Sequence, residues 1–256
     1  MIIDAFDPSS PAVFGPEAIF GARGSLADAC VVTFSLTALE HAIERFHPRQ
    51  IAVIPALNGD RPVYMIDDSA KRIAFYLSPI TSAGAGAGME DAAYITGAKH
   101  FVVFGSCGSL DASHTEGKLI VPTEAYRDEG FSYHFAPAAD FIKVRNADLV
   151  AGVLSSLGLP CALGRCWTTD ALYRETRDNV SKRRGEGCIA VDMECAGLQA
   201  MCDFRGLEYY TFFYSGDLLD APQWEQRILG NTAEKDHQLS NFLVAVEIAK
   251  RAADRS

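Results

Sequence analysis

The segment covering residues 188–220 constrains the fold more than any other part of this 256-residue chain. It begins with a short apolar run, residues 189–191, between a glycine and an aspartate, which is typical of a buried strand. Apolar residues then recur at helical spacing from Met193 to Phe204, and an Arg-Gly pair follows, as at a helix end. The aromatic run at residues 209–214 predicts a second buried strand. This order of strand, helix and strand indicates an α/β fold.

Three acidic residues lie where these predicted strands end. Asp192 and Glu194 come at the strand-to-helix junction, and Asp217 follows the second strand. Ligands bind at the carboxyl ends of strands in open α/β sheets, so the three carboxyls are candidate site residues. The alternative is structural, with Asp192 capping the helix and Glu194 favouring its first turn. This segment alone leaves both interpretations open.

The run VDMECAGLQAM, residues 191–201, resembles the Val-Glu-Met-Glu-Ala-Ala-Gly segment of the nucleoside phosphorylase-I family. That family contains purine nucleoside phosphorylases, uridine phosphorylases and methylthioadenosine/adenosylhomocysteine nucleosidases. The resemblance implies that Asp192 and Met193 contact a nucleoside and that Glu194 binds its ribose hydroxyls. It also implies a catalytic role for Asp217, because purine-specific members carry an Asp 23 positions after that Glu (217 − 194 = 23), although the local order here is Ser-Gly-Asp.

A Gly-rich stretch, GSCGS at residues 105–109, follows an apolar run that predicts a buried strand. A Gly-rich turn after a strand leaves backbone N–H groups free to bind an anion, although structural turns use the same residues. The longer run GAKHFVVFGSCGSL resembles the family's phosphate loop. That resemblance implies that Gly105 and Ser106 bind phosphate, and that Cys107 and Gly108 contact the nucleoside.

The cations with which phosphorylases of this family bind phosphate are not matched. The Arg expected two residues before the loop glycine is Val103, and the segment TFSLTALE after the first strand has no Arg. Valine carries neither a charge nor a hydrogen-bond donor. We therefore predict that Arg127 binds phosphate, ahead of Arg23 and Arg61. The missing cations also keep open a nucleosidase that uses water.

The run RDEGFSYHFAP, residues 127–137, is similar to a segment of uridine phosphorylases. This similarity makes Arg127 and His134 candidate site residues, and an exposed loop with solvated charges is the alternative.

The run TTDALYRETRD, residues 168–178, resembles the family's base-recognition loop. Its predicted nucleoside contacts are Thr169, Leu172 and Tyr173. The Gln and Arg that read uracil in uridine phosphorylases are replaced by Thr176 and Asp178. The replacements favour a purine base over a pyrimidine.

Glycines 84, 86 and 88 precede a predicted helix of about ten residues that ends near Gly97. Their pattern lacks the third glycine and the following acid of a dinucleotide-binding fingerprint. We interpret them as a loop between a strand and a helix, where the family also carries small residues.

Composition excludes several classes of function. The net charge is −10 and no basic patch is visible, which argues against nucleic-acid binding. The seven cysteines form no CxxC pair, so we expect reduced, buried thiols and no metal site. No apolar run approaches the roughly 20 residues of a membrane span, and the N-terminus lacks the basic region of a signal peptide. We therefore expect a cytoplasmic protein.

Alternating strands and helices predict one α/β domain over residues 1–256, with an irregular N-terminal segment at residues 1–28, and the resemblance implies a mixed β-sheet flanked by helices. The resemblance implies phosphate-dependent cleavage of a purine nucleoside to base and ribose 1-phosphate, with inorganic phosphate as co-substrate and no other cofactor. It also implies a homo-oligomer, either a dimer or a hexamer. The alternatives are a uridine phosphorylase, a nucleosidase and a non-catalytic nucleoside-binding protein.

Overall fold

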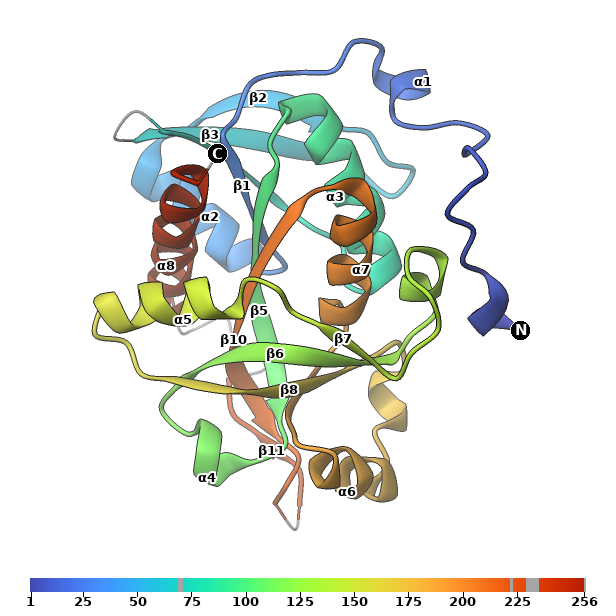
Figure 1. Cartoon of the computed structure of the whole chain (residues 1–256). Coiled ribbons are helices and arrows are strands. Elements are labelled where there is room, and N and C mark those ends of the chain that lie inside the picture. The colour runs from blue at the N-terminus through green and yellow to red at the C-terminus, as the bar shows by residue number, and fades with distance from the viewer. Residues whose placement is uncertain (69–70, 222, 229–234, 256) are drawn as a thin grey trace.

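A mixed β-sheet runs through the protein and carries helices on both faces (Figure 1). The computed structural model describes residues 1–68, 71–221, 223–228 and 235–255. The strands of the sheet are β1 (Ala29–Thr33), β2 (Arg49–Ile54), β3 (Arg61–Asp68), β4 (Lys71–Leu77), β5 (His100–Ser109), β6 (Leu119–Asp128), β7 (Phe141–Lys143), β8 (Cys161–Thr169), β9 (Cys188–Asp192), β10 (Glu208–Leu218) and β11 (Glu225–Gln226).

Strand β5 lies at the centre of the sheet and pairs with three strands. It runs parallel to β1 and β10 and antiparallel to β9. Strand β10 also pairs with β6, and the pairings β6–β8 and β8–β9 lead back to β5, so five strands close a ring. The other strands extend the sheet from β1 through β4 and β3 to β2. The prediction of a mixed α/β sheet is confirmed.

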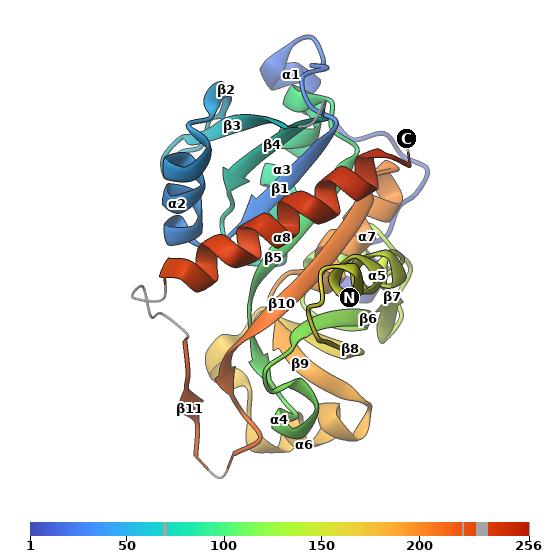
Figure 2. The same ribbon diagram turned by 90° about the vertical axis from the view of Figure 1, so that its left-hand side faces the viewer.

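Helices cover the two faces of the sheet in separate groups. Helix α8 (Lys235–Ala253) crosses one face together with α2 (Leu36–Phe46) and α5 (Ala147–Ser156), as Figure 2 shows. Helices α3 (Ser82–Thr96) and α7 (Cys195–Arg205) pack side by side on the opposite face. The shorter helices are η1 (Ile2–Asp4), α1 (Glu17–Phe20), α4 (Ala112–Thr115), η2 (Phe131–His134), η3 (Leu172–Arg174) and α6 (Arg177–Gly185).

The two helical layers bury two large apolar clusters. On the α8 side, the ring of Phe242 meets Phe75 and Phe104 edge-on, with ring centroids 5.1 and 6.3 Å apart. On the other side, Met89 of α3 and Met201 of α7 pack against the sheet with no exposed surface. Burying each such side chain stabilises the fold by about 1.5–3 kcal/mol. The sheet is therefore held rigidly from both faces.

The glycines at residues 84, 86 and 88 lie inside helix α3 rather than in a loop before it. The prediction of a loop was wrong, because the helix begins at Ser82 and its glycines serve packing. A Cβ on Gly86 would collide with the ring of Phe131, and a Cβ on Gly197 of α7 would collide with the side chain of Ser82. The absence of side chains thus lets α3, α7 and η2 approach one another closely.

The N-terminal segment passes along the outside of α3 and α7 (Figure 1). Phe6 meets Phe204 of α7 edge-on at 6.3 Å, and Phe20 lies 6.5 Å from Tyr94 of α3. Two short helices, η1 and α1, interrupt a segment that is otherwise irregular.

Candidate active site

A cavity of about 210 Å³ opens at the carboxyl ends of strands β1, β4, β5 and β10. These four strands run in the same direction, so their ends meet at one edge of the sheet. Strand β9 reaches the same edge from the opposite direction through its pairing with β5. The lining residues are Phe34, Ile80, Ser106, Cys107, Gly108, Leu172, Glu175, Val191, Asp192, Met193, Glu194 and Asp217.

Asp192 lines the cavity but uses its carboxylate to hold helix α7 in place. One carboxylate oxygen accepts the Thr168 hydroxyl at 2.7 Å, and the other accepts the backbone N–H groups of Glu194 and Cys195 at 3.0 and 2.6 Å. The side chain therefore satisfies orphan donors at the start of the helix. Burial raises the pKa of Asp192 to about 6, although these hydrogen bonds oppose the shift.

Glu194 presents its carboxyl to the cavity from the first residue before helix α7. One of its oxygens accepts the backbone N–H of Thr81 at 2.6 Å. Thr81 has a φ of 75°, a conformation that costs a non-glycine residue about 1–3 kcal/mol and that recurs at functional sites. Burial, and then the nearby charge of Asp192, raise the pKa of Glu194 to about 8.

Asp217 reaches the cavity because strand β10 carries a β-bulge at Gly216. The pairing with β5 joins Ser215 to Cys107 and Asp217 to Gly108, which leaves Gly216 as the extra residue. This bulge accounts for the local order Ser-Gly-Asp. The indole N–H of Trp224 donates to one carboxylate oxygen of Asp217 at 2.7 Å. Burial raises the pKa of Asp217, and the bond from Trp224 opposes that shift.

The Gly-rich stretch at residues 105–109 is the end of strand β5 and not a turn. Its backbone pairs with β10 as far as Ser109, and residues 108 and 109 also pair with β9. The predicted turn was wrong because two partners that are distant in sequence continue the ladder. Ser106, Cys107 and Gly108 line the cavity, whereas Gly105 lies against the ring of Phe34. Burial raises the pKa of the Cys107 thiol, so this cysteine is not a thiolate nucleophile.

The predicted base-recognition loop contributes two residues to the cavity. Leu172 lines it, whereas the side chain of Tyr173 is 97% exposed and does not belong to the lining. Thr169 is buried, and its hydroxyl accepts the N–H of Ala171 at 3.3 Å. Glu175 lines the cavity and was missed by the sequence analysis. The one available signal was its position three residues after Leu172, on the same face of a helical turn.

Arg127 does not line the cavity. Its guanidinium donates to the Ser132 hydroxyl at 2.8 Å and to the carbonyl oxygens of Pro137 and Ala136 at 2.6 and 3.3 Å, and it stacks on the Tyr133 ring. The arginine thus holds together the segment after β6, and a role in phosphate binding finds no support in this geometry. His134, on the same segment, is exposed and also lies outside the lining.

Four carboxyl groups and no Lys or Arg line the cavity within the described part of the chain. Two of the carboxyls, Asp192 and Glu194, lie close together in the sequence before α7. The other two, Glu175 and Asp217, also interact, since burial and then the charge of Asp217 raise the pKa of Glu175 to about 7. The cavity therefore favours neutral or partly positive ligands and is a poor site for an isolated anion.

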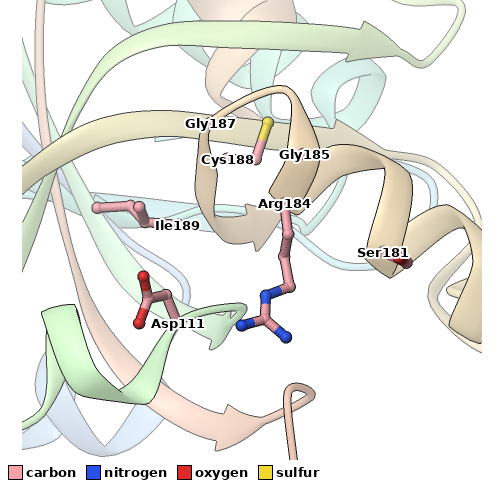
Figure 3. Close-up of a pocket in the computed structure, with 7 residues that line it drawn as sticks. All are labelled: Asp111, Ser181, Arg184, Gly185, Gly187, Cys188 and Ile189. Carbon is pink, nitrogen blue, oxygen red and sulfur yellow. The ribbon is translucent and has the colours of Figure 1, made fainter.

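A second hollow, of about 410 Å³, lies on the surface beside α6 and the start of β9 (Figure 3). Arg184, Ser181, Gly185, Gly187, Cys188, Ile189 and Asp111 line it. It contains a cationic side chain, but none of the candidate site residues that the sequence motifs indicate.

No cluster of metal-ligating side chains occurs among the residues that the structure describes. Within the same residues, no helix has the length and apolar character needed to cross a membrane.

Comparisons with known proteins identify the family of this chain. A family model described as the phosphorylase superfamily matches residues 30–253. A DeoD-type purine nucleoside phosphorylase of Bacillus cytotoxicus is 25% identical over 160 residues, which are 61% of this chain and 65% of the relative's length.

Two solved structures share the fold. Purine nucleoside phosphorylase from Toxoplasma gondii, in complex with immucillin-H, aligns with a TM-score of 0.73 and 19% identity over 91% of this chain and 94% of its own. AMP nucleosidase from Bacteroides thetaiotaomicron aligns with a TM-score of 0.68 and 16% identity over 90% of both chains. The family match covers nearly the whole sheet and both helical layers, so the chain belongs to the phosphorylase superfamily, in the nucleoside phosphorylase-I family that its motifs resemble.

Proposed function

We propose that this protein cleaves the N-glycosidic bond of a purine nucleoside. The observation that carries the proposal is the meeting of Met193, Glu194 and Asp217 around one small cavity at the carboxyl edge of the sheet. The relatives are named as purine nucleoside phosphorylases, which supports the choice of a purine. The cavity volume limits the ligand to a small molecule.

The cleavage builds positive charge on the ribose and negative charge on the departing base. Ionised Glu194 suits the ribose, because a carboxylate can accept hydrogen bonds from both the 2′ and 3′ hydroxyls. Hydrogen bonds from these hydroxyls would favour the ionised form of Glu194 and so offset the rise in its pKa that burial causes. Asp217 suits the base, where an acid near N7 of a purine can supply a proton to the leaving group.

Water is the nucleophile that the cavity favours. Phosphate is an anion that proteins bind with Arg, Lys or converging N–H groups. No cation lines the cavity in the described residues, and residues 105–109 continue strand β5, paired with β10, rather than forming a turn of converging N–H groups. Within the family, the AMP nucleosidase structure is a precedent by name for cleavage without phosphate. The proposed products are therefore the free base and ribose.

Phosphorolysis is the second candidate, and one observation favours it. Ser106 is an exposed residue within β5 that lines the cavity, where its hydroxyl can donate to an anion. A second subunit would then have to supply the cation.

We also propose that the protein is a homo-oligomer, either a dimer or a hexamer. Three apolar side chains of the N-terminal segment are exposed and support this proposal: Val13, Phe14 and Ile19.

The test is an incubation of the purified protein with inosine, adenosine and uridine, with and without inorganic phosphate. We expect both purine nucleosides to be cleaved faster than uridine, with ribose as the product in either buffer. Asp217→Asn should lower kcat/KM for the purines by about 10²–10⁴-fold. Asp148→Asn, on the exposed first turn of α5, is the matched control and should leave the rate unchanged.

Each other outcome assigns a different function. Ribose 1-phosphate formed only with phosphate present would select phosphorolysis. A preference for uridine that ignores Asp217→Asn would exclude the purine assignment. Binding of nucleosides without any cleavage would identify a non-catalytic binding protein.

A further inference from the structure

Glu175 faces the cavity because a short 3₁₀ helix precedes it. Residues three apart eclipse one another in such a helix, so Glu175, which follows the last residue of η3, lies on the same side as Leu172, the first residue of η3. The backbone N–H of Glu175 donates to the carbonyl of Leu172 at 3.4 Å, and both side chains line the cavity. Tyr173 and Arg174, between them, are exposed. The carboxyl is thus directed inward by the backbone, and no family motif assigns it a role.

Asp217 is held in place from the opposite side by the segment that follows β10. Strand β11 pairs Asp217 with Gln226, which brings Trp224 back over the carboxylate. The indole N–H donates to Asp217 at 2.7 Å. An indole nitrogen can only donate, so the oxygen that it contacts must be an unprotonated acceptor. This bond stabilises the ionised form of Asp217.

Two carboxyls that share a small cavity without a cation cannot both ionise at low cost. Burial and the charge of Asp217 raise the pKa of Glu175 to about 7, whereas burial raises the pKa of Asp217 and the bond from Trp224 opposes that rise. Asp217 therefore ionises first, and its charge then keeps the proton on Glu175. The other titratable groups that line the cavity are Cys107, Asp192 and Glu194, and none of them is a cation.

We propose that Glu175 and Asp217 form a proton-sharing pair, and that Glu175 holds the proton that the leaving base takes up. This inference rests on the proposed function. As the bond between C1′ and the base nitrogen breaks, its electron pair goes to the base, and the shared proton passes from Glu175 through Asp217 to that base. Water forms the new bond to C1′ and releases a proton, so the pair regains one proton through solvent in each turnover. Glu175 acts through Asp217 and is a positioning residue rather than a group that touches the reacting atoms.

A direct titration tests the pair without reference to activity. The protein is labelled with ¹³C at its glutamate side-chain carboxyls and followed by NMR from about pH 4 to 9, and Glu175→Gln identifies the Glu175 signal by its loss. We expect a midpoint of about 7 for Glu175. Asp217→Asn should lower that midpoint by about half a pH unit or more, because the neighbouring charge is gone. A midpoint near the ordinary value of 4.5, or one that Asp217→Asn leaves unchanged, overturns the inference.

The pH profile of kcat/KM for inosine provides the functional readout. Wild-type activity should fall as the pH rises through about 7, where the pair loses its last proton. In Glu175→Gln only Asp217 can hold the proton. The alkaline limb of the kcat/KM profile should therefore move to lower pH by about one unit. We expect about tenfold lower activity at pH 8 and a near wild-type rate at pH 5.5. Glu40→Gln, on the exposed side of α2, is the matched control and should reproduce the wild-type profile.

The two measurements separate this inference from the function on which it rests. An active Glu175→Gln enzyme with a wild-type alkaline limb overturns the pair and leaves the nucleoside-cleaving function intact. A protein that cleaves no nucleoside in any form removes the function, while the NMR midpoint still decides whether the two carboxyls share a proton.

Discussion

Asp192 and Glu194 are two residues apart, yet their carboxyls have different surroundings. Asp192 accepts three hydrogen bonds, all from groups around the start of α7. Glu194 accepts the backbone N–H of the strained residue Thr81, and its side chain lines the cavity. The capping interpretation of the sequence thus applies to Asp192, and the ligand-binding interpretation remains a proposal for Glu194.

The cap at Asp192 leads to a prediction on stability. Asp192→Ala should lower the free energy of unfolding by about 1–2 kcal/mol, because two buried N–H groups and the Thr168 hydroxyl lose their acceptor. Asp192→Asn keeps an acceptor and should cost clearly less. Urea denaturation at pH 7 measures both variants. Equal stability of the alanine variant and wild type would contradict the capping role.

At the scale of elements, the close packing of α3 against α7 and η2 depends on glycines, although glycine has a low intrinsic helix propensity. Gly86→Ala and Gly197→Ala should each destabilise the fold by about 1–3 kcal/mol, because the new methyl group meets Phe131 or Ser82. Gly152 of α5 is the matched control, since a Cβ added there would have no neighbouring atom within 4 Å. Gly152→Ala should stabilise the protein by about 0.4–1 kcal/mol. Thermal unfolding of the three variants checks the order, and a stabilised Gly86→Ala would contradict the packing argument.

The sequence predicted those elements whose signals are local. The apolar run at residues 189–191 and the helical spacing from Met193 to Phe204 predicted β9 and α7, and the aromatic run at residues 209–214 lies within β10. The turn predicted at residues 105–109 failed because β9 and β10, which extend β5, lie about 80 and 110 residues further along the chain. Glu175 was not predicted as a site residue for a similar reason. Its direction depends on the phase of a single 3₁₀ turn, and its partner Asp217 comes from a distant strand.

At the scale of the whole molecule, four carboxyl groups line one cavity, and their burial raises their pKa values. The pKa is raised to about 6 for Asp192, about 7 for Glu175 and about 8 for Glu194, and it is also raised for Asp217. Between the ordinary pKa of each carboxyl and its raised pKa in the folded state, the folded protein still binds a proton that the unfolded chain has released. The stability contributed by these groups is therefore present at low pH and is lost as the pH rises from the ordinary values toward the folded ones. A ligand whose hydroxyls pair with Glu194 would recover part of that loss, which links binding to stability.

Glu194→Gln isolates the largest of these effects, because glutamine has the same shape and cannot ionise. The ordinary pKa of the glutamate is 4.5 and its folded pKa is about 8, so wild type should lose stability between those values while the variant does not. We expect the variant to be more stable than wild type by about 1–2 kcal/mol at pH 8 and equal to it near pH 4.5. Its kcat/KM for purine nucleosides should nevertheless fall about tenfold or more, since the charge-assisted bonds to ribose are lost. Urea denaturation at both pH values, with Glu40→Gln as the exposed control, measures the difference. Parallel pH dependences of Glu194→Gln and wild type would show that Glu194 ionises without cost in the folded protein, and the carboxyl would then be ionised before any ribose arrives.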